Sequence, residues 1–224
     1  MLIPSIDLMG GKIVQLVQGE KKALEFDDLD YWIERFSKYP LVQVIDLDGA
    51  RGTGNNRAIV AQIAQRLQCQ VGGGIRTAET ARELLQTGVR RVIFGSVLLK
   101  DGKIDAEYAA MLATSLGTAA LVFALDSRSG RVAIEGWRKA TAVTPFDMIR
   151  ALEPFCDTFL YTHIDTEGLM AGIPMDVVAA IRQATSRRLV VAGGIKTQHE
   201  IASLDALGMD AVVGMALYAG RISA

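Results

Sequence analysis

Cysteine and histidine are scarce in this 224-residue chain, which has two of each. Cys69 and Cys156 lie far apart and each stands beside an apolar run, so they form no metal-binding pattern. Two histidines are too few for a histidine-based metal site. We therefore expect two reduced, buried cysteines and a reducing compartment, which places the protein in the cytoplasm.

Long apolar runs and excess charge are also missing. No run reaches the roughly 18 apolar residues of a membrane span, and no basic start followed by an apolar stretch marks a signal peptide. The net charge of −1 provides no basic field that would attract nucleic acid or a membrane surface. We therefore expect neither as a partner, and local groups must hold any anionic ligand.

Short, β-branched apolar runs recur along the chain and are typical of strands buried on both faces. Amphipathic stretches such as Thr77–Thr87 and Met175–Ala184 separate them. Eight strands alternating with helices predict one α/β domain over residues 1–224, a (β/α)8 TIM barrel whose last helix is short. The expected strands are Leu2–Leu8, Leu41–Leu47, Cys69–Gly72, Arg91–Phe94, Ala120–Asp126, Thr158–Ile164, Leu189–Ala192 and Asp210–Val213.

The first half of the chain is repeated in the second. Asp7 matches Asp126 at an offset of 119, and the segment IDLDG at 45–49 matches IDTEG at 164–168 at the same offset. VGGGIRT and VAGGIKT match at an offset of 120. These matches predict two half-barrels, about 1–118 and 119–224, related by a pseudo-twofold axis. A ligand group bound by one half then has a counterpart opposite it.

Glycine-rich turns follow four of the predicted strands, at matched positions of the two halves. Such turns let backbone N–H groups approach a phosphate, and a helix N-terminus adds a favourable dipole. A single turn of this kind can simply serve a tight connection, but two matched pairs favour two phosphate sites and a bisphosphate ligand. The contacts expected from these turns and nearby residues are Gly73, Gly74, Arg76, Gly95, Ser96, Gly168, Gly193, Gly194, Gly214 and Met215.

Asp7 and Asp126 end the first and fifth predicted strands, where barrel enzymes carry catalytic groups. These strands face each other across the barrel axis, so the two carboxylates can flank one substrate as general base and general acid. For each aspartate alone, capping of loop amides is the alternative. Thr162, at the end of the sixth strand, can donate a hydrogen bond to a reacting oxygen.

A second acidic set ends the second and sixth predicted strands: Asp46, Asp48, Asp165 and Glu167. The i, i+2 spacing puts two carboxylates on one side of an extended strand, so a metal site has to be considered. We favour the alternative, contacts to substrate hydroxyls or hydrogen bonds that anchor loops.

The two longest loops after strands are Gly10–Phe26 and Ser127–Thr141, which are repeat partners. Long loops over a barrel mouth are usually mobile and close on the substrate. We expect Gly19 of the first loop and Trp137 of the second to contact the substrate. Trp137 would stack on a flat heterocycle, and the alternative is a tryptophan packed on the barrel rim.

The chain resembles the phosphoribosylformimino-aminoimidazole carboxamide ribotide isomerase family of histidine biosynthesis in the segments IPSIDLMGGKIVQLVQG, VIDLDGA, VGGGIRT, VIFGS, LDSRSGRVAIEGW, THIDTEG and VAGGIKT. The resemblance runs nearly end to end. It implies an Amadori rearrangement, aminoaldose to aminoketose, of an imidazole carboxamide bisphosphate. It further implies that Asp7 is the general base at the ribose C2 proton, that Asp126 is the acid that helps to open the ring, and that Thr162 assists. A monomer without cofactor or metal is implied as well.

The chain departs from that family at three positions. Many relatives carry arginine at the position of Gln15, and most carry aspartate at the position of Glu167. Relatives that also isomerise phosphoribosyl anthranilate carry arginine at the position of Glu135. A carboxylate there would repel anthranilate, so we expect a single-substrate enzyme.

Two other functions stay open. The sister cyclase of the same pathway is a half-barrel repeat that works with a glutaminase partner, and it shares the two aspartates and the phosphate turns. The QLVQG and EGW segments speak against it. A non-catalytic phosphosugar-binding barrel would keep the glycine turns, but it has no need for both Asp7 and Asp126.

Overall fold

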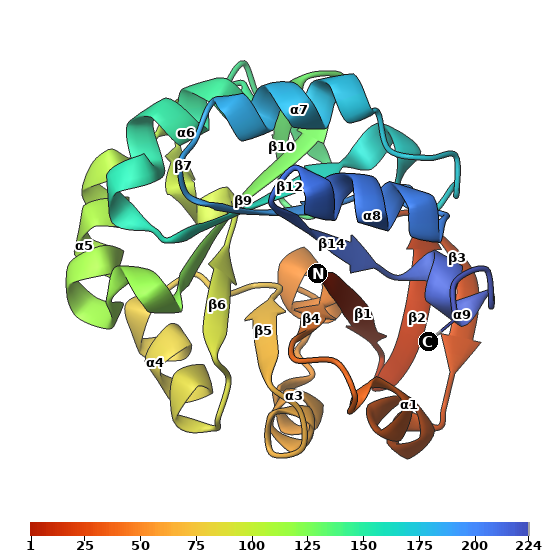
Figure 1. The fold of residues 1–224 in the computed structure, drawn as a ribbon. Helices are drawn as coiled ribbons and strands as arrows, with labels where there is room; N and C mark the ends of the chain where they lie inside the picture. The colour runs from red at the N-terminus through yellow and green to blue at the C-terminus, as the bar shows by residue number, and fades with distance from the viewer. Residues whose placement is uncertain (224) are drawn as a thin grey trace.

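The computed structural model describes residues 1–223, in which eight parallel strands close into a barrel surrounded by helices (Figure 1). β6 pairs with β9 and β14 pairs with β1, which completes the ring and confirms the TIM barrel. Each strand lies within two residues of its predicted bounds. In order around the barrel the strands are β1 (Leu2–Met9), β4 (Val42–Asp46), β5 (Cys69–Gly72), β6 (Arg91–Phe94), β9 (Leu121–Arg128), β12 (Thr158–His163), β13 (Arg188–Ala192) and β14 (Met209–Val213).

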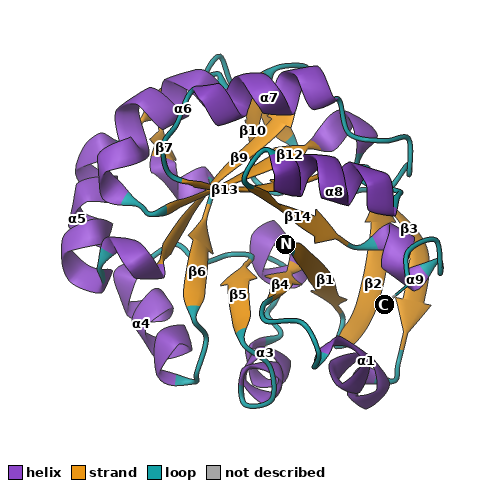
Figure 2. Cartoon of the chain, viewed as in Figure 1, coloured by secondary structure: helices purple, strands orange, loops and turns teal. Residues whose placement is uncertain are grey.

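Helices cover the outside of the barrel (Figure 2). Thr77 caps the start of α4, and Thr197, its repeat partner, caps α8 in a capping box with Glu200. The last helix has four residues, as expected from the sequence. The helices are α1 (Leu29–Phe36), α2 (Leu47–Arg51), α3 (Arg57–Ala64), α4 (Ala78–Gln86), α5 (Ala106–Leu116), α6 (Pro145–Leu152), α7 (Met175–Gln183), α8 (Gln198–Ala206) and α9 (Met215–Tyr218), with short 3-10 turns η1 (Ser96–Leu98), η2 (Thr118–Ala120), η3 (Glu153–Phe155) and η4 (Ile164–Thr166).

The two long loops after β1 and β9 consist largely of β-hairpins, which the sequence interpretation missed. β2 (Lys12–Val17) runs antiparallel to β1 and pairs with β3 (Lys21–Phe26). β10 (Arg131–Ile134) does the same at β9 and pairs with β11 (Lys139–Ala140). A small hairpin, β7 (Leu99–Lys100) and β8 (Lys103–Ile104), follows β6.

Tight turns open both hairpins. Gly10 and Gly11 have φ of 60° and 80°, and Ser129 and Gly130 have φ of 50° and 75°. Two consecutive residues with positive φ form the turn whose twist matches antiparallel strands, so Gly-Gly and Ser-Gly were the sequence signals for these hairpins.

The core has two layers, because successive side chains of a strand face opposite sides. On β12, Leu160 packs inside the barrel, whereas Phe159 and Tyr161 pack outside against the helices. The same alternation directs Asp7 and Asp126 into the barrel at the carboxyl ends of their strands.

Both cysteines are buried and unpaired, as expected, and burial raises the pKa of each thiol to about 12. Across residues 1–223, the structure contains no helix with the length and apolar character needed to cross a membrane.

Candidate active site

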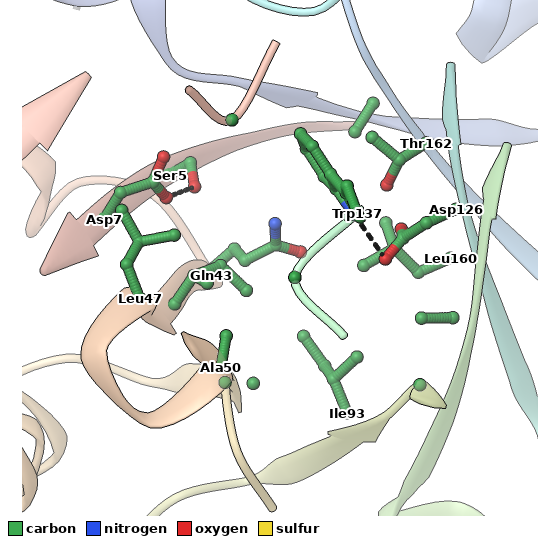
Figure 3. Close-up of a pocket in the computed structure, with 18 of the residues that line it drawn as sticks. Ser5, Asp7, Gln43, Leu47, Ala50, Ile93, Asp126, Trp137, Leu160 and Thr162 are labelled. Atoms are coloured by element: carbon green, nitrogen blue, oxygen red, sulfur yellow. Dashed lines mark hydrogen bonds between the residues drawn. The ribbon is translucent and has the colours of Figure 1, made fainter. Parts of the chain in front are cut away.

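A cavity of about 210 Å³ lies at the carboxyl ends of the barrel strands (Figure 3). Asp7 and Asp126 line it from opposite sides, because three strands separate β1 from β9 in each direction around the ring. Thr162 of β12 is the register partner of Asp126 and also lines the cavity. The structure therefore brings together all three residues that we predicted to be catalytic.

Asp7 lies in the cavity wall and is half-buried. The Ser5 hydroxyl donates to Oδ1 of Asp7 at 2.8 Å. Burial raises the pKa of Asp7 to about 6, although the Ser5 hydrogen bond opposes this rise. A carboxylate with this pKa is ionised at neutral pH and is a stronger base than an ordinary aspartate.

Asp126 is held by the indole of Trp137, whose Nε1 donates to Oδ2 at 2.8 Å (Figure 3). Burial raises the pKa of Asp126, although the hydrogen bonds from Trp137 and Thr162 oppose this rise. The Trp137 ring enters the cavity and packs on Gly19, where an added Cβ would lie 2.7 Å from ring atom Cε3. Glycine is therefore required at position 19 for the indole to reach Asp126.

Glu167 is a third carboxylate at this cavity, and it is the member of the second acidic set for which the sequence left substrate contact and loop anchoring as alternatives. Burial, with the nearby charges of Asp7 and Asp126, raises the pKa of Glu167 to about 7, against the backbone hydrogen bonds of Gly168 and Gly194. The sequence signal was its place in the IDTEG repeat, which does not reveal on which side of the loop the side chain lies.

Asp46 and Asp48 serve to anchor loops. Asp46 accepts hydrogen bonds from the backbone of Gly49 at 3.0 Å and from the backbone and side chain of Asn56, both at 2.7 Å. Asp48 accepts from the backbone of Gly10 at 2.7 Å and from the Asn56 side chain at 2.9 Å. Over residues 1–223, no group of three or more His, Cys, Asp or Glu side chains is arranged to hold a metal ion.

The predicted phosphate turns of the first half line the main cavity. Gly73 needs its φ of 101° and its missing side chain, because a Cβ there would collide with the backbone of Asp46. Two cations stand at this end, Arg76 and Arg51, and the sequence interpretation missed Arg51. Its Nη2 donates to the backbone oxygen of Gly19 at 2.8 Å. The turn residues at the cavity are Gly73, Gly74, Gly95 and Ser96.

The predicted phosphate turns of the second half line a small adjoining pocket that contains no lysine or arginine among the described residues. Lys196, the repeat partner of Arg76, is exposed and donates to the backbone oxygen of Ala171 at 2.9 Å. The buried Gln15 side chain packs on Gly214, where a Cβ would lie 2.5 Å from its Oε1. The predicted residues at this pocket are Gly168, Gly193, Gly194, Gly214 and Met215.

Comparison with known proteins gives consistent matches over the whole barrel. The sequence profile of the family described as "Histidine biosynthesis protein" matches residues 1–223. The "1-(5-phosphoribosyl)-5-((5-phosphoribosylamino)methylideneamino) imidazole-4-carboxamide isomerase" of Methanocaldococcus jannaschii is 36% identical, with 99% of this chain and 95% of the relative covered. The protein of the same name from Thermus thermophilus is 37% identical with the same coverage, and that from Methanosphaera stadtmanae is 33% identical, with 100% and 96% covered.

Proposed function

The chain belongs to the histidine biosynthesis protein family, and we propose that it catalyses the isomerisation for which its relatives are named. This reaction is an Amadori rearrangement, in which the aminoaldose of the bisphosphate opens and becomes an aminoketose. The observation that carries the proposal is the pair Asp7 and Asp126, which face each other across one cavity between two sets of glycine turns.

The rearrangement requires one proton to be added and one removed. A general acid protonates the ring oxygen of the ribose as the C–O bond breaks, which leaves a protonated imine at C1. Asp7, as carboxylate, then removes the proton from C2. The electrons of that bond form the C1=C2 double bond, the C=N electron pair returns to nitrogen, and the resulting enolamine tautomerises to the ketone. The pKa of Asp7 of about 6 suits this base near neutral pH.

Two carboxyl groups are candidates for the acid. The family resemblance assigns it to Asp126, with Thr162 assisting. The pKa of Glu167 of about 7 favours Glu167, because this group still holds a proton near neutral pH. Burial raises the pKa of Asp126 as well, but the hydrogen bonds from Trp137 and Thr162 oppose this rise by stabilising its charged form.

The test is turnover of the bisphosphate by the wild-type protein, Asp7→Asn, Asp126→Asn and Glu167→Gln, with binding measured in parallel. Loss of the base is expected to lower kcat by about 10²-fold or more while binding persists. The variant that loses the acid shows the same loss, so the assays on Asp126→Asn and Glu167→Gln decide between the two groups. Binding without turnover by the wild type would support the phosphosugar-binding barrel, and co-purification with a glutaminase would support the cyclase.

We further propose that the enzyme acts as a monomer in the cytoplasm, without a metal or an organic cofactor. The support is that Asp46 and Asp48 use their oxygens to anchor loops, and that the cysteines are buried thiols. Turnover is expected to be unchanged after dialysis against a chelator. A loss that added metal restores would contradict this proposal.

A further inference from the structure

Three polar side chains follow one another at the end of β12 and in η4, and we call Tyr161, His163 and Asp165 the β12 relay. The Tyr161 oxygen lies 3.0 Å from Nδ1 of His163, and Nε2 of His163 lies 3.9 Å from Oδ2 of Asp165. Tyr161 is 1% exposed and packs outside the barrel, on the side of the strand opposite to Thr162. The relay therefore stands behind the wall of the cavity.

The surroundings of His163 favour one tautomer. Asp165 lies beyond hydrogen-bond distance of Nε2, but its negative charge attracts a proton on that nitrogen, which leaves Nδ1 to accept from the Tyr161 hydroxyl. Burial raises the pKa of Tyr161 to about 12, which keeps that hydroxyl protonated as a donor. The imidazole is thereby oriented as a spacer between a buried phenol and the carboxylate of Asp165.

Asp165 in turn binds one turn of each hairpin. Its Oδ2 accepts from the backbone amide of Ser129 at 2.8 Å, in the turn that opens the hairpin carrying Trp137. The backbone oxygen of Asp165 accepts from the side-chain Nε2 of Gln18 at 3.0 Å. The backbone amide of Gln18 donates to the backbone oxygen of Glu167, also at 3.0 Å. The chain from η4 to Glu167 is therefore hydrogen-bonded to both hairpins at the mouth of the barrel.

The first half of the barrel lacks such a relay. The repeat partners of Tyr161 and His163 are Val42 and Val44, both buried in the apolar core. There the hairpin turn is held by Asp48, the partner of Glu167. In the second half, Asp165 takes over the hydrogen bond to the hairpin turn, and Glu167 is left facing the cavity.

We propose that His163 and Asp165 are positioning residues for the isomerisation: they hold η4 and the second hairpin so that Glu167 faces the substrate. This inference rests on the proposed function. It does not make either residue a catalytic group, because neither lines the cavity.

The kinetic test uses His163→Val, which introduces the residue of the first half, and Asp165→Ala, which removes the acceptor for the Ser129 amide. The control is His199→Gln, since His199 is exposed on α8. We expect kcat to fall by about 10- to 100-fold with KM nearly constant, because Glu167 is misplaced while the phosphate turns persist. The pH optimum is expected to move lower, because a more solvated Glu167 loses its proton at lower pH. An equal loss with no shift of the optimum would contradict a role through Glu167.

Two further measurements need no turnover, so the inference and the proposed function can fail separately. With only two histidines, nitrogen NMR of labelled wild-type protein reads the tautomer of His163 directly. We expect a protonated Nε2 and a bare Nδ1, and the reverse would overturn the relay. Amide hydrogen exchange of Ser129 is expected to speed up in both relay variants, and unchanged exchange would show that Asp165 does not hold the turn.

Discussion

At the mouth of the first half-barrel, Asp48 accepts a hydrogen bond from the Gly10 amide, whereas its partner in the second half, Glu167, faces the cavity. The amide of Ser129, which corresponds to Gly10, is bound by Asp165. The hairpin-turn amide is thus bound by residues that are not repeat partners in the two halves. Equivalent strands carry carboxylates at equivalent positions, but the loop hydrogen bonds decide which of these carboxylates faces the cavity.

The phosphate ends differ in the same way. Arg51 and Arg76 lie at the first-half end, where the partner positions of the second half carry Met170 and Lys196. Met170 is neutral and Lys196 bonds to a loop oxygen. The first end combines backbone amides with guanidinium groups, and the second relies on backbone amides.

The largest effect that tests the comparison is on kcat. Glu167→Gln is expected to lower kcat by about 10²- to 10³-fold, because a proton donor near neutral pH is lost. Asp48→Asn, the same change at the partner position, is expected to leave kcat within a few-fold, since Asp48 is bound to Gly10 and Asn56. Steady-state turnover decides this, and equal losses in both variants would mean that the two positions do not differ in task.

The next effect is on stability, with opposite signs at the two positions. The pKa of Glu167 is raised from 4.5 to about 7 in the folded protein. Its contribution to the free energy of unfolding is therefore present below the unfolded pKa and is lost as pH rises through 7. Glu167→Gln is therefore expected to stabilise the fold at pH 8 by up to about 3 kcal/mol, and much less at pH 5.

In the folded protein the pKa of Asp48 is lowered. Its contribution to the free energy of unfolding is therefore present above the unfolded pKa and is lost as pH falls through the folded pKa. Asp48→Asn is therefore expected to destabilise the protein at pH 8. Urea unfolding of both variants at both pH values measures the two signs. Two effects of the same sign would contradict the division of tasks.

A smaller effect concerns the phosphate ends. Arg51→Ala is expected to raise KM by about tenfold, because one charge-assisted contact to the substrate is lost. Lys196→Ala is expected to change KM less than about twofold, because Lys196, unlike Arg51, lines neither of the two pockets. Titration of KM against salt sharpens the contrast, since the slope is expected to fall only in the arginine variant.

The smallest expected signal is turnover of phosphoribosyl anthranilate. Glu135 is 55% exposed and pairs with Lys139 at 3.6 Å, on the hairpin that carries Trp137. We expect this carboxylate to disfavour an anthranilate group at the mouth, so turnover lies at least about 10²-fold below that of the main substrate. Comparable turnover of the two substrates would contradict the single-substrate prediction.

Strand positions and the opposed pair Asp7 and Asp126 followed from apolar periodicity and the repeat, because strand alternation alone decides which side chains enter the barrel. The same information failed in the loops. The positions of Glu167 and Arg51 depend on hydrogen bonds between segments more than thirty residues apart, such as Ser129 to Asp165 and Arg51 to Gly19. No local pattern records such pairings, so the sequence left the role of Glu167 open between substrate contact and loop anchoring, and it gave no indication of Arg51.

The contact between Gly19 and Trp137 distinguishes the two halves of the barrel. The glycine belongs to the first half and the indole to the second, and the indole reaches Asp126 only because position 19 has no side chain. At the repeat offset of 119, Trp137 corresponds to Gln18 and Gly19 corresponds to Arg138. The two hairpins therefore differ at both positions of this contact, and the indole that holds Asp126 has no counterpart at Asp7, which is held by Ser5 instead.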